Sequence, residues 1–266
     1  KLLVSTSFDY SVLLWQIDEM KELKQLMGHE ASVNVAKFSN SGEVLATAGD
    51  DAKIFLWDIH LSTNSIANRM LLDSHTAKIV GLDFSTDGQY LASAGWDHSI
   101  KIWDTDTGDL VRSISGHDGP VSAVNFSEDG EYIYSAGYDG TIKHSRLSDG
   151  NVGRTLIDNG WGVNVLKVDE VNNLLLYGTI DGLMKVQSLD TGEVFIRIWE
   201  EGTPVSALNY YPEYQKAVFG TMKGRIILVD LEKMQIQRDF LAVDGPVWDV
   251  VYNLEKESVV VGGLDD

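Results

Sequence analysis

The sequence predicts an all-β protein made of similar four-stranded antiparallel sheets that follow one another along the chain. Two observations support this prediction. A short turn centred on aspartate returns at residues 9, 51, 97, 139, 181 and 265, with Lys223 in the equivalent place of one repeat, at intervals of 42 residues with one of 46. Between these turns, short segments rich in Val, Ile, Leu and aromatic residues alternate with turn-forming pairs such as Asp87-Gly88, which is typical of strands joined by tight turns.

Each repeat is expected to contain four strands. In the repeat around Asp97 these are Ile79–Phe84, Tyr90–Gly95, Ser99–Trp103 and Leu110–Ser115. The chain opens on a second strand, Leu2–Ser7, and closes after another second strand, Ser258–Gly263, so that 25 strands are expected. The polar stretch His60–Asn68 is expected to take up the one four-residue insertion as a longer loop.

A sheet of this size cannot bury both of its faces alone, but it can do so when stacked radially on similar neighbours. The predicted fold is therefore a β-propeller of four-stranded antiparallel blades, formed by residues 1–266 as a single domain. Seven blades are expected, with the first and last incomplete. One further strand would precede Lys1 and two would follow Asp266. Because an open sheet edge promotes aggregation, the complete protein is expected to close the ring.

Composition restricts the partners. The chain has 21 Lys and Arg against 40 Asp and Glu, a net charge of −19, which repels phosphate backbones and anionic lipids and favours a basic protein or peptide. The same charge makes direct nucleic-acid binding unexpected. Membrane insertion is not expected either, since no apolar run approaches the length of a membrane helix. The absence of cysteine excludes disulfides, thiolate metal sites and cysteine nucleophiles within these residues. The compartment stays open, with the cytoplasm as the default.

Repeated dipeptides point to a family. Gly28-His29 and Gly116-His117, together with Trp57-Asp58 and Trp103-Asp104, make the chain resemble the WD40-repeat β-propellers over its whole length. The resemblance implies that a His, a Ser or Thr, the turn Asp and a Trp form a hydrogen-bonded set in each blade. The positions that match are His29, Thr47, Asp51, Trp57, His75, Ser93, Asp97, Trp103, His117, Ser135 and Asp139, with Ser5, Asp9 and Trp15 in the first blade.

The later repeats depart from this set. Ser145 replaces one tryptophan, and the later positions read Asn159, Glu201 and Val243 for His, Tyr177, Phe219 and Val261 for Ser or Thr, and Gln187 and Val229 for Trp. A buried polar network is stable only when all its members are satisfied, so the joint loss of several members is expected to cost less than the loss of one. The repetition of Ser, His and Asp in successive blades favours a structural role over a catalytic triad.

The residue before each turn centre is the candidate binding position. The resemblance implies that it faces one rim of the propeller, where partners bind. The predicted partner-binding rim comprises Phe8, Trp96, Tyr138, Ile180, Met222 and Leu264, with Asp50 as the polar exception. Large apolar groups at such a position have the chemistry of a protein-binding hot spot. Alternatively they fold inward and cap the blade cores, above all Ile180, Met222 and Leu264. Neighbouring groups are Glu30, Lys78, Asp118, Trp161 and Trp248.

The expected function is that of a non-catalytic interaction scaffold without cofactor or metal, alone or within a larger complex or multidomain chain. The six histidines lack the spacing of a zinc site, and a Thr-Gly turn accounts better than a calcium loop for residues Asp104–Gly108. An enzyme of the central channel would require catalytic groups at the starts of the first strands. The residues there are Asn34, Val80, Ser122, Asn164, Ser206 and Trp248, which are not such a set.

A second, weaker resemblance leads to another function. The segments Ser135–Gly140 and Asp244–Trp248 look like parts of bacterial WD40 propellers fused to a c-type cytochrome domain. This would imply an exported, periplasmic electron-transfer protein whose propeller docks a partner. The haem would lie outside these residues, because its attachment requires cysteines.

Overall fold

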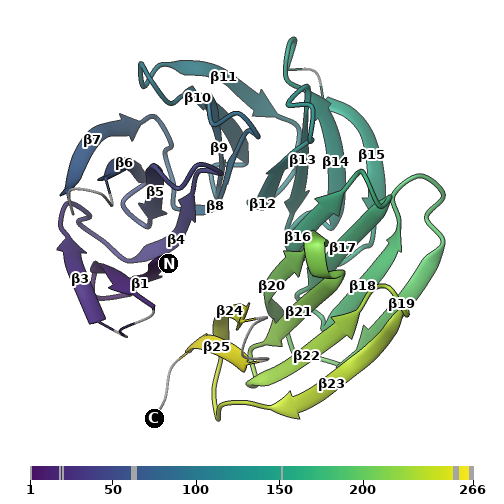
Figure 1. Cartoon of the computed structure of the whole chain (residues 1–266). Helices are drawn as coiled ribbons and strands as arrows, with labels where there is room; N and C mark the ends of the chain where they lie inside the picture. Colours follow the sequence, from purple (N-terminus) through teal and green to yellow (C-terminus); the bar gives the residue numbers. More distant parts are fainter. Residues whose placement is uncertain are drawn as a thin grey trace. The chain divides into compact units, whose positions relative to one another are not determined.

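The computed structural model describes residues 2–17, 19, 21–60, 65–150, 152–253 and 258–263, and it contains 25 strands (Figure 1). The strands form antiparallel sheets in chain order: five sheets of four strands, one of three and one of two. The fold is an all-β propeller of four-stranded blades whose first and last sheets are incomplete in this chain, as predicted. Among the described residues, no helix has the length and apolar character needed to cross a membrane.

The strands group into two compact units. The first comprises residues 1–135 with 143–156. Its sheets are β1 (Leu2–Thr6), β2 (Val12–Gln16) and β3 (Lys21–Leu26); β4 (Val33–Phe38), β5 (Val44–Gly49), β6 (Lys53–His60) and β7 (Ser65–Asp73); and β8 (Ile79–Phe84), β9 (Tyr90–Gly95), β10 (Ser99–Asp104) and β11 (Leu110–Ser115).

The second unit comprises residues 136–142 and 157–266. Its sheets are β16 (Val163–Asp169), β17 (Leu174–Thr179), β18 (Leu183–Ser188) and β19 (Val194–Trp199); β20 (Val205–Tyr211), β21 (Lys216–Thr221), β22 (Arg225–Asp230) and β23 (Gln235–Leu241); and β24 (Val247–Asn253) with β25 (Ser258–Gly263). The sheet β12 (Val121–Phe126), β13 (Tyr132–Gly137), β14 (Thr141–Arg146) and β15 (Val152–Asp158) contributes residues to both units. That residues 1–266 form one domain stays a prediction.

The four-residue insertion lengthens a hairpin. The sequence predicts a longer loop over His60–Asn68, but β6 and β7 pair as far as His60 with Ser65. The strands have eight and nine residues, against six in each strand of the next sheet. The prediction was wrong for Ser65–Asn68 because added residues can continue an antiparallel ladder as readily as they can leave it.

The core lies between successive sheets. In the first unit, Ala46 and Leu56 of one sheet join Leu82 and Leu91 of the next in one buried cluster. The second unit repeats the pattern with Leu176, Val186, Phe219 and Ile227, among others. By contrast, all seven residues of the outer strand β23 are exposed. Stacking therefore buries both faces of the inner strands, as the repeat predicted.

Candidate partner-binding rim

A hydrogen-bonded set braces the turns that carry the predicted rim. In the sheet β8–β11, His75 Nδ1 lies 2.8 Å from Asp97 Oδ2, and its Nε2 lies 2.7 Å from Ser93 Oγ. Trp103 Nε1 donates to the same serine oxygen at 2.9 Å. Asp97 Oδ2 also accepts from the backbone N–H of Thr76 at 3.0 Å. The carboxylate thus ties the turn between β9 and β10 to the segment that enters β8.

The sheet β4–β7 repeats this geometry. His29 Nδ1 lies 2.8 Å from Asp51 Oδ2 and its Nε2 lies 3.0 Å from Thr47 Oγ1. Trp57 Nε1 donates to Thr47 Oγ1 at 3.0 Å. Two sheets with different hub residues, serine and threonine, therefore build the same brace.

Parts of the set occur in two further sheets. His117 Nε2 lies 2.8 Å from Ser135 Oγ. In the first sheet, Trp15 Nε1 donates to Ser5 Oγ at 2.9 Å, in an exposed setting. Asp139 Oδ1 accepts from the backbone N–H of Thr141 at 3.0 Å.

Every donor in the set has an acceptor when the imidazole is neutral and carries its hydrogen on Nδ1. His75 then donates to Asp97 and accepts the hydroxyl proton of Ser93, whose oxygen accepts from the indole. Burial lowers the pKa of His75, and the charge of Asp97 only partly offsets this effect. Burial also opposes ionisation of Asp97, but hydrogen bonds from Ser99 and Thr76 and the interaction with His75 lower its pKa. The set is therefore a structural brace with its donors and acceptors paired.

In the sheet β16–β19 the brace is replaced by other buried residues. Tyr177 and Gln187 occupy the Ser and Trp places, and both are buried. Among the described residues, neither the Tyr177 hydroxyl nor Gln187 Oε1 has a hydrogen-bond partner. Burial raises the pKa of Tyr177 to about 12. Apolar packing carries the stability of this sheet, at the cost of two unsatisfied polar atoms.

A threonine that the sequence analysis missed, Thr179, compensates at the turn of this sheet. Thr179 Oγ1 donates to the turn carboxylate of Asp181 and accepts from the backbone N–H of Leu183 at 3.0 Å. In the sheets with a histidine the same place is glycine, and at Gly95 a Cβ would lie 2.6 Å from His75 Nδ1. A signal was present in the sequence: Gly49, Gly95 and Gly137 accompany a histidine, whereas Thr179 and Thr221 stand in two of the repeats that lack it.

The backbone at the rim position is fixed in the same way in several sheets. Its N–H donates to the carbonyl of the residue 18 places earlier, at the entry to the first strand. The bonds are Asp50 to Ser32 at 2.8 Å, Trp96 to Lys78 and Ile180 to Gly162 at 2.9 Å, and Met222 to Pro204 at 3.0 Å. The rim side chains therefore start from a rigid scaffold, which suits a recognition surface.

In the first unit the rim side chains are partly accessible. Phe8 is 56% exposed. Trp96 is half-buried, and Lys78 Nζ lies 3.6 Å from its ring centroid, so that an ammonium group covers one indole face. Asp50, the polar exception, is exposed and accepts from Asn34 Nδ2 at 2.8 Å.

In the second unit the rim side chains are half-buried. The hydroxyl of Tyr138 donates to Asn164 Oδ1 at 3.0 Å, and burial raises the pKa of this phenol. Ile180 packs over Gly162, since its Cδ1 lies 3.2 Å from the place that a Cβ on this glycine would occupy. Met222 is also half-buried. These groups lie neither fully inward nor fully in solvent, so each of the two predicted orientations describes them in part.

The neighbouring predicted groups differ in exposure. Trp161 is 58% exposed and Trp248 is 43% exposed, both in the second unit. Glu30 forms an ion pair with Lys53 at 2.7 Å. Leu264 lies outside the described residues. The second unit thus adds two accessible indoles that the sequence analysis treated only as neighbours.

The residues at the starts of the first strands have a structural role. Asn34, Val80, Asn164, Ser206 and Trp248 each occupy a β-bulge, where the ladder skips one residue. Three of their side chains donate to a carbonyl of the next sheet: Asn34 Nδ2 to Ile79 at 3.1 Å, Asn164 Nδ2 to Val205 at 2.8 Å, and Ser206 Oγ to Val247. We call these bonds the inter-sheet stitches.

The segment Asp104–Gly108 forms a turn closed by its own backbone. Asp104 Oδ1 accepts from the N–H groups of Asp106 and Thr107, both at 2.9 Å. Hydrogen bonding from Thr107 lowers the pKa of Asp104, and Asp106 forms an ion pair with Arg69 at 2.6 Å. This is the geometry of an Asx turn, and it supports the Thr-Gly turn over the calcium loop.

Comparison with known proteins identifies the repeats. The family profile described as "WD domain, G-beta repeat" matches residues 20–58, 68–104 and 108–144. Each matched stretch begins at or next to the outer strand of one sheet and ends in the third strand of the next. The sequence repeat is thus offset by one strand from the sheet.

Curated relatives share short segments with the chain. A probable cytosolic iron-sulfur protein assembly protein CIAO1 homolog from Caenorhabditis elegans is 46% identical over 59 residues, 21% of this chain and 18% of that protein. A subunit of chromatin assembly factor 1 from Gallus gallus is 40% identical over 65 residues, 22% of this chain and 12% of that protein. Small ribosomal subunit protein RACK1y from Oryza sativa subsp. japonica is 37% identical over 57 residues, 21% and 17% respectively. Each match spans less than a fifth of the relative. The matched repeats, the brace and the sheet order together identify WD40 repeats in this β-propeller and support its assignment to the WD40-repeat family.

Proposed function

We propose that the chain is a non-catalytic scaffold that binds a protein or peptide through the rim position of its sheets. The observation that carries the proposal is the recurrence of a large apolar side chain at the rim position, whose backbone N–H makes the same hydrogen bond at Trp96, Ile180 and Met222. The described rim residues are Phe8, Trp96, Tyr138, Ile180 and Met222. Apolar and aromatic anchors on a rigid scaffold bind well, because little conformational entropy is lost on binding.

The relatives support membership in a complex. One is named for the assembly of iron-sulfur proteins, another as a component of a chromatin assembly factor, and a third as a protein of the small ribosomal subunit. Those names describe multi-protein systems. We propose that this chain likewise belongs to a multi-protein complex, with a partner of its own.

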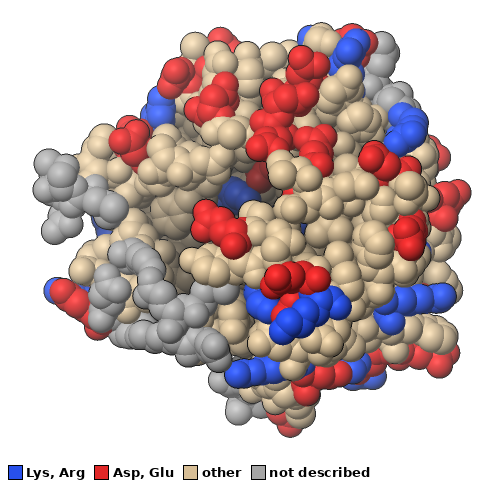
Figure 2. Space-filling model, turned by 45° about the vertical axis from the view of Figure 1, so that its right-hand side comes forward, with Lys and Arg blue, Asp and Glu red and all other residues tan. Residues whose placement is uncertain are grey.

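The charge of the chain favours a basic partner. Acidic side chains are spread over the face shown in Figure 2, in keeping with a net charge of −19. At Trp96, the chain's own Lys78 already lies over the indole. A lysine or arginine of the partner can take that place while the acidic field accelerates the encounter.

The test compares rim variants with an aromatic variant away from the rim. The full-length protein is tagged, and retention of its native partner is quantified for Trp96→Ala, Met222→Ala and the control Phe195→Ala. Phe195 is 37% exposed on the outer strand β19, at the end of the strand away from the turn that carries Ile180. Loss of a hot-spot anchor is expected to weaken retention about tenfold or more at the rim and to leave the control unchanged.

Equal retention by all three variants would contradict the proposal. Tyr138→Phe provides a second rim test, because it keeps the ring and removes only the hydroxyl bonded to Asn164. A c-type haem spectrum of the native protein would instead favour the electron-transfer alternative.

A further inference from the structure

A row of polar side chains, two of them basic, crosses one face of the sheet β16–β19. Tyr177 of β17 lies directly opposite Lys185 of β18, which in turn lies directly opposite Arg197 of the outer strand β19. Residues paired in this way point to the same face of an antiparallel sheet, so the three side chains are neighbours. Lys185 Nζ is 5.7 Å from the centroid of the Tyr177 ring, which places the ammonium group beside the phenol. We call these three residues the basic row.

The two cations of the basic row have no acidic partner. Among the residues that the structure describes, neither side chain forms an ion pair or a hydrogen bond. Asp158, in the segment that enters the sheet, is exposed, and no ion pair joins it to Lys185. Burial lowers the pKa of Lys185, and the charge of Arg197 lowers it further. Like charges directly opposite each other destabilise a sheet, and here they stand in a chain with 40 acidic and 21 basic residues.

Lysines at the equivalent place of two other sheets have an oxygen partner. Lys101 Nζ donates to Ser74 Oγ at 3.2 Å, and Lys143 Nζ donates to the carbonyl of Gly116. Both acceptors lie in the segment that precedes the first strand of the sheet. Lys185 also stands four residues after its turn centre, but its ammonium group has no such acceptor in the part of the chain that the structure describes. The fold therefore offers this position a partner in other sheets and none here.

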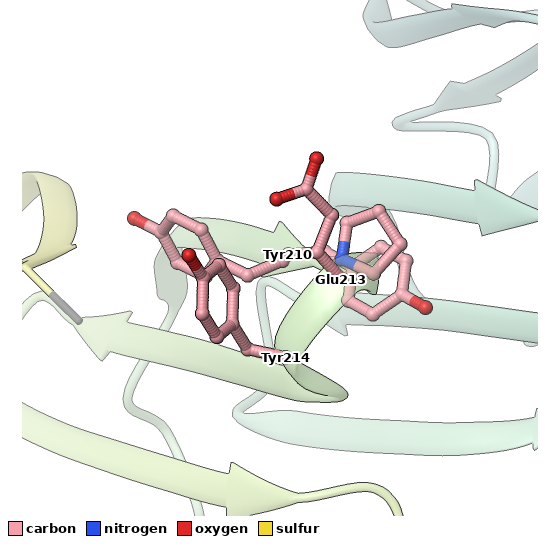
Figure 3. A pocket seen from close by; sticks show the side chains of 5 residues that line it. Tyr210, Glu213 and Tyr214 are labelled. Carbon is pink, nitrogen blue, oxygen red and sulfur yellow. The ribbon is translucent and has the colours of Figure 1, made fainter.

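The hydroxyl of Tyr177 adds an unused donor to the basic row. Its side chain is fully buried, and the hydroxyl has no hydrogen-bond partner within the described residues. Other tyrosines of this unit differ: Tyr210 donates to Asp169, and Tyr214, which Figure 3 shows in the link between β20 and β21, is 52% exposed to water. The charge of Arg197 lowers the pKa of the Tyr177 phenol against the larger effect of burial, so the guanidinium acts on the phenol as well as on the ammonium group.

We propose that the basic row binds a phosphate group, carried either by a phosphorylated side chain of a protein partner or by a free small phosphate. The ammonium group supplies a point charge and the guanidinium a planar fork of donors, both of which suit phosphate oxygens. A phosphate dianion has the charge to balance both cations and three acceptor oxygens for the ammonium, guanidinium and phenol. A carboxylate would leave one of the two cations uncompensated. Since Arg197 is exposed, the group approaches from the side of the outer strand.

The basic row is separate from the proposed partner-binding rim. Tyr177 precedes the rim residue Ile180 by three residues, roughly 10 Å along an extended strand. The net charge of −19 opposes the approach of an anion. At physiological salt, however, charges more than about 8 Å away are largely screened, so the two adjacent cations dominate at the site.

The experiment uses the full chain and follows the binding of inorganic phosphate by calorimetry, at an ionic strength held constant with chloride. Saturable binding is expected at about pH 7.5, and binding severalfold weaker at about pH 5, where phosphate carries a single charge. A ligand of the folded state stabilises it, so phosphate is also expected to raise the urea midpoint of the wild type. Absence of saturable binding of both inorganic phosphate and a phosphorylated peptide would overturn the proposal.

Three variants locate the site. Lys185→Gln and Arg197→Gln are each expected to weaken phosphate binding about tenfold, and Tyr177→Phe about threefold, since charged donors contribute more than a neutral one. The matched control is Lys101→Gln, whose ammonium group is bonded to Ser74 in another sheet and whose loss is expected to change the affinity by less than about twofold. A folded Lys185→Gln variant that binds phosphate as the wild type does would contradict the assignment.

A pair of peptides decides the source of the phosphate group. One contains phosphoserine and the other the same sequence with serine. Tighter binding of the phosphopeptide than of inorganic phosphate would assign a modified side chain of a partner, and tighter binding of inorganic phosphate would assign a free small phosphate. The rim variant Met222→Ala is expected to leave phosphate binding unchanged, so that failure of the rim and failure of the basic row can be told apart.

Discussion

Replacing Ser93 by alanine tests whether the brace stabilises its sheet. The Ser93 hydroxyl is shared by His75 Nε2 at 2.7 Å and Trp103 Nε1 at 2.9 Å, all within the buried sheet β8–β11. Its removal leaves two buried ring nitrogens without their partner. At about 1–3 kcal/mol for each unsatisfied group, Ser93→Ala is expected to lower the free energy of unfolding by about 2–6 kcal/mol.

Ser5→Ala provides the matched control. Ser5 Oγ accepts from Trp15 Nε1 at the same distance, 2.9 Å, but the pair is exposed, so water replaces the lost partner. The expected cost is about 1 kcal/mol or less. Both variants are unfolded in urea and followed by circular dichroism and tryptophan fluorescence, whose transitions should coincide if one free energy describes the change.

Equal costs for Ser93→Ala and Ser5→Ala would refute the argument that burial gives the brace its energy. A double-mutant cycle with Trp103→Phe supplies a second check, because residues that share a hydrogen bond should show a coupling of about 0.5–3 kcal/mol. Additive effects would show that the indole and the hydroxyl act separately.

Two further predictions concern the same sheet. Gly95→Ala should lower the free energy of unfolding by about 1–3 kcal/mol, because the new Cβ would lie 2.6 Å from His75 Nδ1 and 2.7 Å from Asp97 Oδ1. Gly262→Ala, whose Cβ meets nothing nearer than 3.8 Å, should stay within about 0.5 kcal/mol in the same urea assay. Since burial lowers the pKa of His75, the unfolded chain binds the proton more tightly. Stability should therefore fall as pH drops below the ordinary value of 6.5 and through the lowered pKa. The urea midpoint of the wild type should drop between about pH 7.5 and 5, and that of His75→Gln should drop less. Equal pH profiles would contradict this assignment.

The sequence was sufficient to predict the strands because each one is bounded by turn chemistry that is local. The repeat around Asp97 has the predicted strands to within one residue, Ser99–Asp104 in place of Ser99–Trp103. The length of the β6–β7 hairpin could not be predicted, because the polar residues of this stretch can form either a loop or a continuation of the two paired strands. Their pairing as far as Ser65 depends on cross-strand contacts, which composition does not encode.

The site was less predictable than the fold. The repeat spacing together with the WD40 resemblance assigned Trp96 and Tyr138 to the predicted rim position, but the partners of these two side chains depend on tertiary contacts. The position of Lys78 over Trp96 requires the length of the lysine side chain and the bend of the strand entry. The bond from Tyr138 to Asn164 requires the bulge that turns Asn164 out of the ladder.

The inter-sheet stitches limit where the chain can change length. Each stitch joins a side chain at the start of one first strand to a carbonyl at the start of the next, as Asn164 joins Val205. A residue added between those two points within the inner strands would move the donor away from its acceptor. The extra residues of the β6–β7 hairpin leave the stitch from Asn34 to Ile79 intact, because they extend outer strands. Outer hairpins are thus the places where evolution, or a protein engineer, can insert sequence without disturbing the inner strands.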